Sequence, residues 1–230
     1  MHLFEKQAFD GISDFESSAI YADLAFKKCV FESCGISAGR KPEFRSIVRN
    51  VRIEQCSAYG CHVGAAIVED TVIDGLKSGD ILQTWGTVFK HVTLRGKIGR
   101  LMISRKFVTT PGGAEQERAF DLANAEYYRH VDWALDISQG EFSELDIRSV
   151  PGHLIRRNPE TQARIKRERL VEADWRKLPF KAGVTQVIFD LFLDRGDPDV
   201  TYVAGKREKD FREMVADIEL LRKEGIAEPD

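Results

Sequence analysis

The sequence predicts a mainly β chain in which short strands stack as laps of a four-sided parallel β-helix, a solenoid, over residues 1–157. Three observations support this class. Apolar residues recur at a five-residue spacing, the pattern repeats after about twenty residues, and helical periodicity replaces it beyond residue 157. We therefore expect an α-rich C-terminal module over 158–230 that packs on the solenoid, and an insertion into the solenoid at about 105–129.

The five-residue spacing is clearest between Ala19 and Ile36, where two inward positions flank one outward residue. No charged residue occupies these inward positions. A β-helix needs this arrangement, because each short side must stack its side chains on the equivalent side of the next lap. The inward pairs are Ala19/Tyr21, Leu24/Phe26, Cys29/Phe31 and Cys34/Ile36.

The same pairs return in sets that start at Ser46, Ala66 and Thr87, which gives a lap of about twenty residues. Stacking then predicts columns of like residues, for example Phe26, Ile53, Ile73 and Leu94. In this frame the later inward pairs include Ile81/Gln83, Lys97/Gly99 and Met102/Ser104. After the insertion, a returning lap is expected with the pairs Leu135/Ile137, Gly140/Phe142 and Leu145/Ile147.

The four cysteines fall in the same frame, with Cys29 stacked on Cys56 and Cys34 stacked on Cys61. Free cysteine behaves as a small buried hydrophobe, so we interpret these residues as core thiols. A zinc site is the alternative, but the spacing is not the C-x2-C of structural zinc sites. An oxidised pair is a further alternative. We expect no metal and no cofactor.

The pieces ADLAF, KKCVF and ESCGI place a small or apolar residue two positions before Leu, Phe or Ile. In this respect residues 19–104 resemble the pentapeptide-repeat proteins. The resemblance implies a right-handed quadrilateral β-helix, and in some members a DNA-mimicking function that shields topoisomerases. Acidic and basic residues are nearly balanced over residues 1–104, so we rank mimicry last. The alternative fold is an ordinary β-sandwich with the same alternation.

An outward apolar stripe indicates a packing or binding surface. It consists of Ile20, Ile47, Ile67 and Val88, and Trp85, Leu82 and Ile103 are expected to add outward apolar residues on another side. We expect the C-terminal module to cover the stripe, with a homodimer or another protein partner as the alternative.

The C-terminal module is expected to be mostly helical. Asn158 and Pro159 resemble an N-cap and a first-turn proline, which predicts a helix that reaches Lys177. A second helix is expected to end at Gly196, followed by the strand DVTYVA and a last helix from about Lys206 to Glu224.

Composition excludes several functions. The net charge of −3 gives no global attraction to nucleic acid, and no apolar stretch is long enough to span a membrane. We expect a cytoplasmic, non-enzymatic interaction protein that binds another macromolecule. The alternative is a carbohydrate-active β-helix enzyme that uses Glu54 and Asp74, two outer-face carboxylates about one strand spacing apart. Salt bridges to neighbouring arginines would remove that chemistry.

Overall fold

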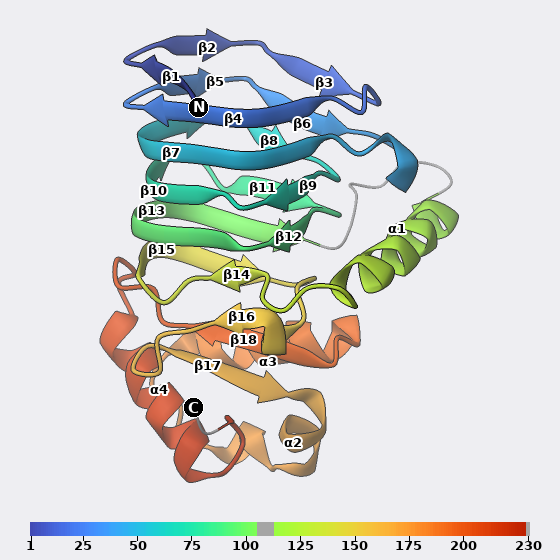
Figure 1. Ribbon diagram of the computed structural model, residues 1–230. Coiled ribbons are helices and arrows are strands. Elements are labelled where there is room, and N and C mark those ends of the chain that lie inside the picture. Colours follow the sequence, from blue (N-terminus) through green and yellow to red (C-terminus); the bar gives the residue numbers. More distant parts are fainter. Residues whose placement is uncertain (105–112, 229–230) are drawn as a thin grey trace.

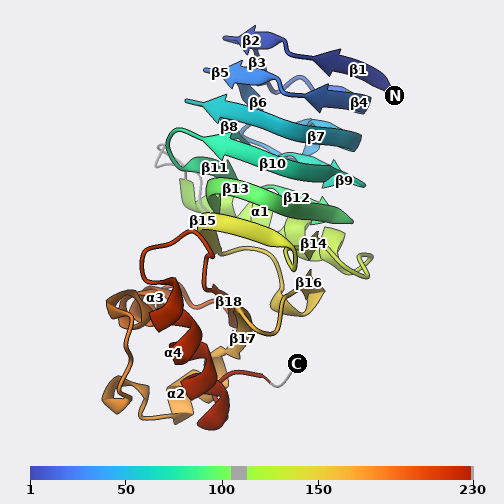
Figure 2. The same cartoon turned by 90° about the vertical axis from the view of Figure 1, so that its left-hand side faces the viewer.

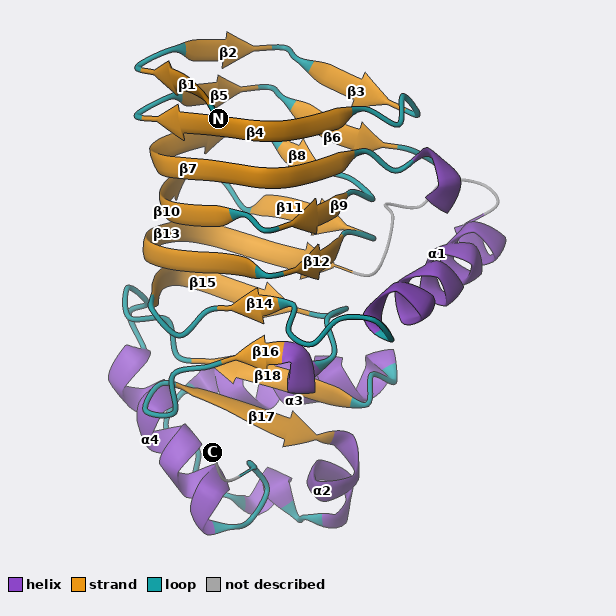
Figure 3. Cartoon of the chain, in the orientation of Figure 1, coloured by secondary structure: helices purple, strands orange, loops and turns teal. Residues whose placement is uncertain are grey.

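The computed structural model describes residues 1–104 and 113–228. Strands from residues 1–104 and 135–156 form a curled sheet of parallel strands, and a smaller module with three of the four described α-helices follows at the C-terminal end (Figures 1 and 3). The N-terminal strands and the C-terminal module lie at opposite ends of the stack. The chain is therefore mainly β with a partly helical C-terminal part.

The sheet consists of successive laps, each parallel to the one before it, as the view turned by 90° shows (Figure 2). Lap 1 contains β1 (His2–Glu5), β2 (Ala8–Asp10) and β3 (Ser13–Phe15), and lap 2 contains β4 (Ile20–Lys27), β5 (Val30–Glu32) and β6 (Gly35–Ala38). Lap 3 contains β7 (Ile47–Tyr59) and β8 (His62–Val63), and lap 4 contains β9 (Ile67–Glu69), β10 (Val72–Ser78) and β11 (Leu82–Trp85). Lap 5 contains β12 (Val88–Lys90) and β13 (Val92–Ser104), and lap 6 contains β14 (Leu135–Asp136) and β15 (Gly140–Ile147), with β16 (Ile155–Arg156) beyond it.

The strand register stacks the columns that the sequence predicts. Phe26 is opposite Ile53, Ile53 is opposite Ile73, and Ile73 is opposite Leu94. The thiols follow the same rule, because the Cys29 amide lies 3.3 Å from Cys56 Sγ and the Cys34 amide 3.4 Å from Cys61 Sγ. The returning lap also lies as expected, with Phe142 opposite Ile98 and Leu145 opposite Leu101.

Backbone turns recur at five-residue intervals, which explains how the sheet curls. Left-handed backbone occurs at residues 6, 11 and 16 of lap 1, at 23, 28 and 33 of lap 2, and at 50, 55 and 60 of lap 3. Most of these residues are not glycine, so each turn costs conformational energy that the stacked laps must offset. The turns separate the short sides that face the interior.

The inward frame shifts by one residue in laps 4 and 5, which corrects three expected pairs. On β13, Gly96 and Lys97 lie where β10 has Gly75 alone, so the register skips there. Such an extra residue is a β-bulge, and the positive φ of Gly96, 66°, fits it. The bulge accounts for Ile98, which is buried where the expected pair Lys97/Gly99 places Lys97. In lap 4 Leu82 and Thr84 lie inward, one position after the expected pair Ile81/Gln83. In lap 5 the buried residues Leu101 and Ile103 lie one position before the expected pair Met102/Ser104.

The C-terminal module pairs a two-stranded antiparallel sheet with helices. It contains β17 (Gln162–Lys166), α2 (Arg167–Glu172), the short helix Trp175–Lys177, α3 (Gly183–Arg195), β18 (Asp199–Val203) and α4 (Phe211–Lys223). α3 ends before Gly196, whose φ is 77°, as predicted. The predicted helix from Asn158 to Lys177 is wrong in its first part. Ala163 and Ile165 are fully buried in the module core while Arg164 and Lys166 lie on the opposite face of the segment and are half-buried, so this segment has the period of a strand.

Candidate functional site

The apolar stripe exists as a column, but its members differ in exposure. Ile20 is opposite Ile47, Ile47 is opposite Ile67, and Ile67 is opposite Val88. Ile20 is 64% exposed, Ile47 and Ile67 are half-buried, and Val88 is fully buried. The stripe is therefore exposed to solvent near lap 1 and buried near lap 5.

The cover over the closed part is helix α1 (Gly113–Tyr128), which corrects the expectation that the C-terminal module covers the stripe. The Tyr128 hydroxyl accepts a hydrogen bond from the Phe89 amide at 3.3 Å, and Tyr127 donates to Glu69 at 2.9 Å. α1 belongs to the predicted insertion, whose residues 105–112 lie outside the described residues.

The buried Arg45 holds α1 against the sheet. Its guanidinium donates to the Gly86 carbonyl at 3.1 Å, bonds to the Asn124 side-chain oxygen, and lies 5.2 Å from the Phe120 ring. Burial lowers the pKa of Arg45 to about 10, so the group remains charged at neutral pH. The contact is structural and fixes which part of the stripe is covered.

Lap 1 forms a free sheet edge. β1, β2 and β3 pair only with β4, β5 and β6, and among the described residues no strand pairs with their outer side. His2, the first residue of β1, is opposite Leu24, so the residues of β4 before Leu24 have no strand partner on the side that faces lap 1. The large apolar side chains exposed along this edge are Met1, Leu3, Ile12, Phe15 and Ile20, between 51% and 64% exposed. We call these residues and strands β1–β3 the first-lap edge.

Trp85 is not a free aromatic platform. It ends β11, is half-buried, and its ring stacks on His62 with centroids 5.0 Å apart and planes 17° apart. Burial lowers the pKa of His62, so this histidine is mainly neutral at neutral pH. Leu82 and Ile103, expected beside Trp85 on the outside, instead belong to the interior because of the frame shift.

The two outer carboxylates lie side by side but between basic residues. Glu54 is opposite Asp74 on β10, and this column continues to Lys27 on one side and Arg95 on the other. Arg95 Nε donates to Asp74 at 2.9 Å. The carboxylate of Asp74 is therefore engaged by Arg95, as expected for an ion pair between neighbouring strands.

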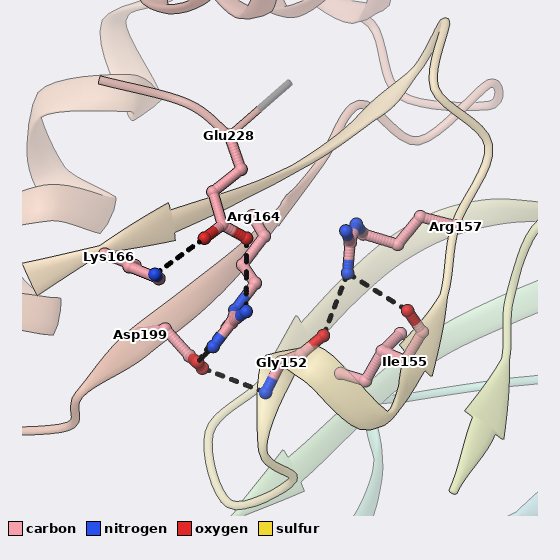
Figure 4. A network of polar contacts seen from close by, with 7 residues as sticks. All are labelled: Gly152, Ile155, Arg157, Arg164, Lys166, Asp199 and Glu228. Atoms are coloured by element: carbon pink, nitrogen blue, oxygen red, sulfur yellow. Dashed lines mark hydrogen bonds and ion pairs between the residues drawn. The ribbon is translucent and has the colours of Figure 1, made fainter. Parts of the chain in front are cut away.

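The other end of the stack is sealed by a polar network between the last lap and the module (Figure 4). Asp199 accepts from the Gly152 amide at 3.0 Å and from Arg164 Nε at 2.9 Å. Glu228 lies 3.1 Å from Arg164 and 3.0 Å from Lys166. Burial alone would raise the pKa of Glu228, but these two cations lower it below its ordinary value. These carboxylates are satisfied internally and leave no reactive group.

A cleft between the last lap and α3 was not predicted from the sequence. It is lined by Asp146 and Arg148 from β15 and the residues that follow it, by Arg195 at the end of α3, and by the carboxyl of Glu208. Arg148 Nε donates to Asp146 at 2.5 Å, and Arg195 lies 3.9 Å from the same carboxylate. Asp146, Arg148 and Arg195 pair with each other, which favours a domain contact over a ligand site.

Within residues 1–104 and 113–228, no three His, Cys, Asp or Glu side chains come together in a way that could hold a metal ion. In the same part of the chain, no helix has the length and apolar composition needed to cross a bilayer. The chain matches no protein-family model, no curated protein and no solved structure. Function must therefore be argued from the surfaces themselves.

Proposed function

We propose that the curled sheet is a right-handed, four-sided β-helix of the pentapeptide-repeat type. Two features support this proposal. Left-handed residues recur at five-residue intervals in the first laps, and like residues stack in register from lap to lap. The bulge in lap 5 accounts for the place near Lys97 where the repeat is lost.

We further propose that the protein is a non-enzymatic binding protein whose partner is another protein chain, held at the first-lap edge. The observation that supports this most strongly is the contrast between the two ends of the stack. The C-terminal end is sealed by the module and its polar network, whereas the first-lap edge exposes unpaired strands together with large apolar side chains. Solenoid proteins need terminal repeats with a polar outer face to remain soluble.

An extended segment of the partner would add a strand beside β1 and the start of β4. Free strand edges present rows of N–H and C=O groups that pair readily with another chain. Leu3 and Ile20 would then provide apolar anchors beside the new strand. Recognition of this kind takes affinity from the backbone and specificity from alternate side chains.

The carbohydrate-active alternative is less well supported. It requires one carboxylate that can stay protonated near another that is ionised. Asp74 is instead bound by Arg95, and Trp85 is packed on His62. Under this proposal, the variant Asp74→Asn should leave every binding property unchanged.

Affinity enrichment with three immobilised forms tests the proposed function. The forms are the natural chain, the edge variant Leu3→Lys/Ile20→Lys, and the control Val171→Lys, which changes a 60% exposed residue of the module. We expect one protein to be retained by the natural chain and by the control at equal yield, and lost from the edge variant. Equal retention by all three forms, or loss from the control alone, would contradict the proposal.

A further inference from the structure

The interior of the curled sheet contains an apolar hollow. Two neighbouring cavities of about 130 and 200 Å³ lie inside laps 2 to 5 and share wall residues that include Ile53, Val63 and Ile73. These side chains belong to the interior cluster, yet they are only half-buried, because the space beside them admits a water-sized sphere. Close packing fails at this place.

The sequence explains the hollow. One inward column starts with Phe9 opposite Phe31, but Phe31 is opposite Ala58, and Ala58 is opposite Ser78. Gly99 is the next residue beside Ser78 in this column, because a Cβ atom added to Gly99 would lie only 2.2 Å from Ser78 Oγ. The column thus changes from rings to three small residues, and the opposite walls contain β-branched residues that cannot reach across.

Aromatic rings close the end of the hollow toward lap 1. The rings of Phe4 and Phe26 stack at 5.2 Å, those of Phe9 and Phe31 stack at 5.3 Å, and the two stacks touch edge to face at 5.3 to 5.7 Å. Phe4 and Phe9 belong to the edge lap, where local opening costs the least. This end provides an entry route for a small molecule.

One polar group faces the hollow without a partner. Thr84 lies on β11 at an inward position between Val63 and Ile103, and it is 6% exposed. Its hydroxyl makes no hydrogen bond within the described residues. The other wall hydroxyls are satisfied, since Thr71 donates to the Glu69 carbonyl at 2.8 Å and Ser78 to the Arg100 carbonyl at 3.2 Å. A buried hydroxyl without a partner is destabilising, and a ligand atom could satisfy it.

We propose that this hollow is a binding site for a small uncharged molecule with an apolar body and one hydrogen-bonding group, such as an alcohol or a ketone. An apolar cavity of about 150 Å³ is large enough for benzene, so the size fits one ring or a short chain. The walls offer hydrocarbon and thiol groups, and the one charged wall residue, Arg100, directs its guanidinium to Glu144 at 2.7 Å. A charged ligand would lose its hydration without compensation. The ligand oxygen binds at Thr84.

Calorimetric titration with phenol and with benzene tests the proposal, because the two probes share a ring and differ by one hydroxyl. We expect saturable one-to-one binding of phenol to the natural chain. In Thr84→Val the ratio of phenol affinity to benzene affinity should fall about tenfold, while benzene binding is kept. An unchanged ratio would overturn the role of Thr84, and the absence of saturable binding of either probe would overturn the site.

A second variant fills the space. Ala58→Phe extends the ring column of Phe9 and Phe31, so it should raise the melting temperature and abolish binding of both probes. Binding at the natural affinity in this variant would overturn the proposal. Should Ala58→Phe not fold, methyl NMR of the natural chain decides. Phenol must then shift the Ile53, Val63 and Ile73 methyl signals and leave those of Ile218, buried in the module, unchanged.

Discussion

The frame shift in lap 5 can be tested by comparing two neighbouring residues. Ile103 is 1% exposed and lies between Thr84 and Ile147, whereas Met102 is half-buried on the outer face of the same strand. The unshifted five-residue frame places Met102 inside and Ile103 outside. The substitutions Ile103→Ala and Met102→Ala therefore distinguish the observed frame from the simple repeat.

The size of the effect follows from the buried atoms. Ile103→Ala removes three carbon atoms from the interior, at about 0.8 kcal/mol for each buried CH₂, or about 2.5 kcal/mol. The residual cavity adds up to about 1 kcal/mol more, because the surrounding strands cannot collapse fully. Met102→Ala removes side-chain atoms that keep contact with water, so we expect a loss below about 1 kcal/mol.

Urea unfolding followed by far-ultraviolet circular dichroism measures both losses. The transition of the curled sheet must be separated from that of the module. The fluorescence of Trp175, buried in the module core, reports the latter once Trp85 and Trp133 are replaced by Phe. Equal destabilisation of the sheet by Met102→Ala and Ile103→Ala, or a loss below about 1 kcal/mol for Ile103→Ala, would contradict the inward position of Ile103.

Three further predictions concern the module and α1. Burial raises the pKa of Glu208 from 4.5 to about 7, so the folded chain retains a proton that the unfolded chain releases. Stability should consequently fall by about 1 to 2 kcal/mol as pH rises from about 4.5 to about 7. In Glu208→Gln, the melting temperature should not show this decrease between about pH 4.5 and about pH 7. Asp217 accepts from the amides of Lys181 and Ala182, so Asp217→Asn should destabilise the module by about 3 kcal/mol in thermal unfolding, with wild-type stability as the contrary result. Arg45→Met should speed amide hydrogen exchange in α1 but not in α3. An α1 exchange rate equal to that of the natural chain would contradict the role given to Arg45.

The sequence was sufficient to predict how the first laps stack. One column contains Phe26, Ile53, Ile73 and Leu94. A one-residue slip in strand register would turn each of these side chains outward, so the apolar pattern specifies the register. The shift at Gly96 could not be read from the spacing, since one extra residue looks the same as a weak repeat. The exposed residue Lys97, expected inside, was the one local signal of the shift.

The candidate surfaces were harder to predict. The stripe from Ile20 to Val88 was identified, but which segment covers it depends on the long-range contact of Arg45 with Asn124. No local pattern encodes that contact. The hollow was also missed, although its signal is present in the sequence as the change from Phe31 to Ala58 and Ser78 along one column. Phe31 and Ala58 are both apolar, so polarity does not distinguish them, whereas side-chain volume does.

The most direct test of the central claim, that successive laps stack like residues around a shared interior, is a methyl NOESY spectrum of the folded chain. Ile53 and Ile73 are opposite each other on neighbouring strands, as are Ile103 and Ile147. We expect strong methyl cross-peaks within both pairs. Absence of both cross-peaks in a well-dispersed spectrum, or cross-peaks from Met102 in place of Ile103, would contradict this claim.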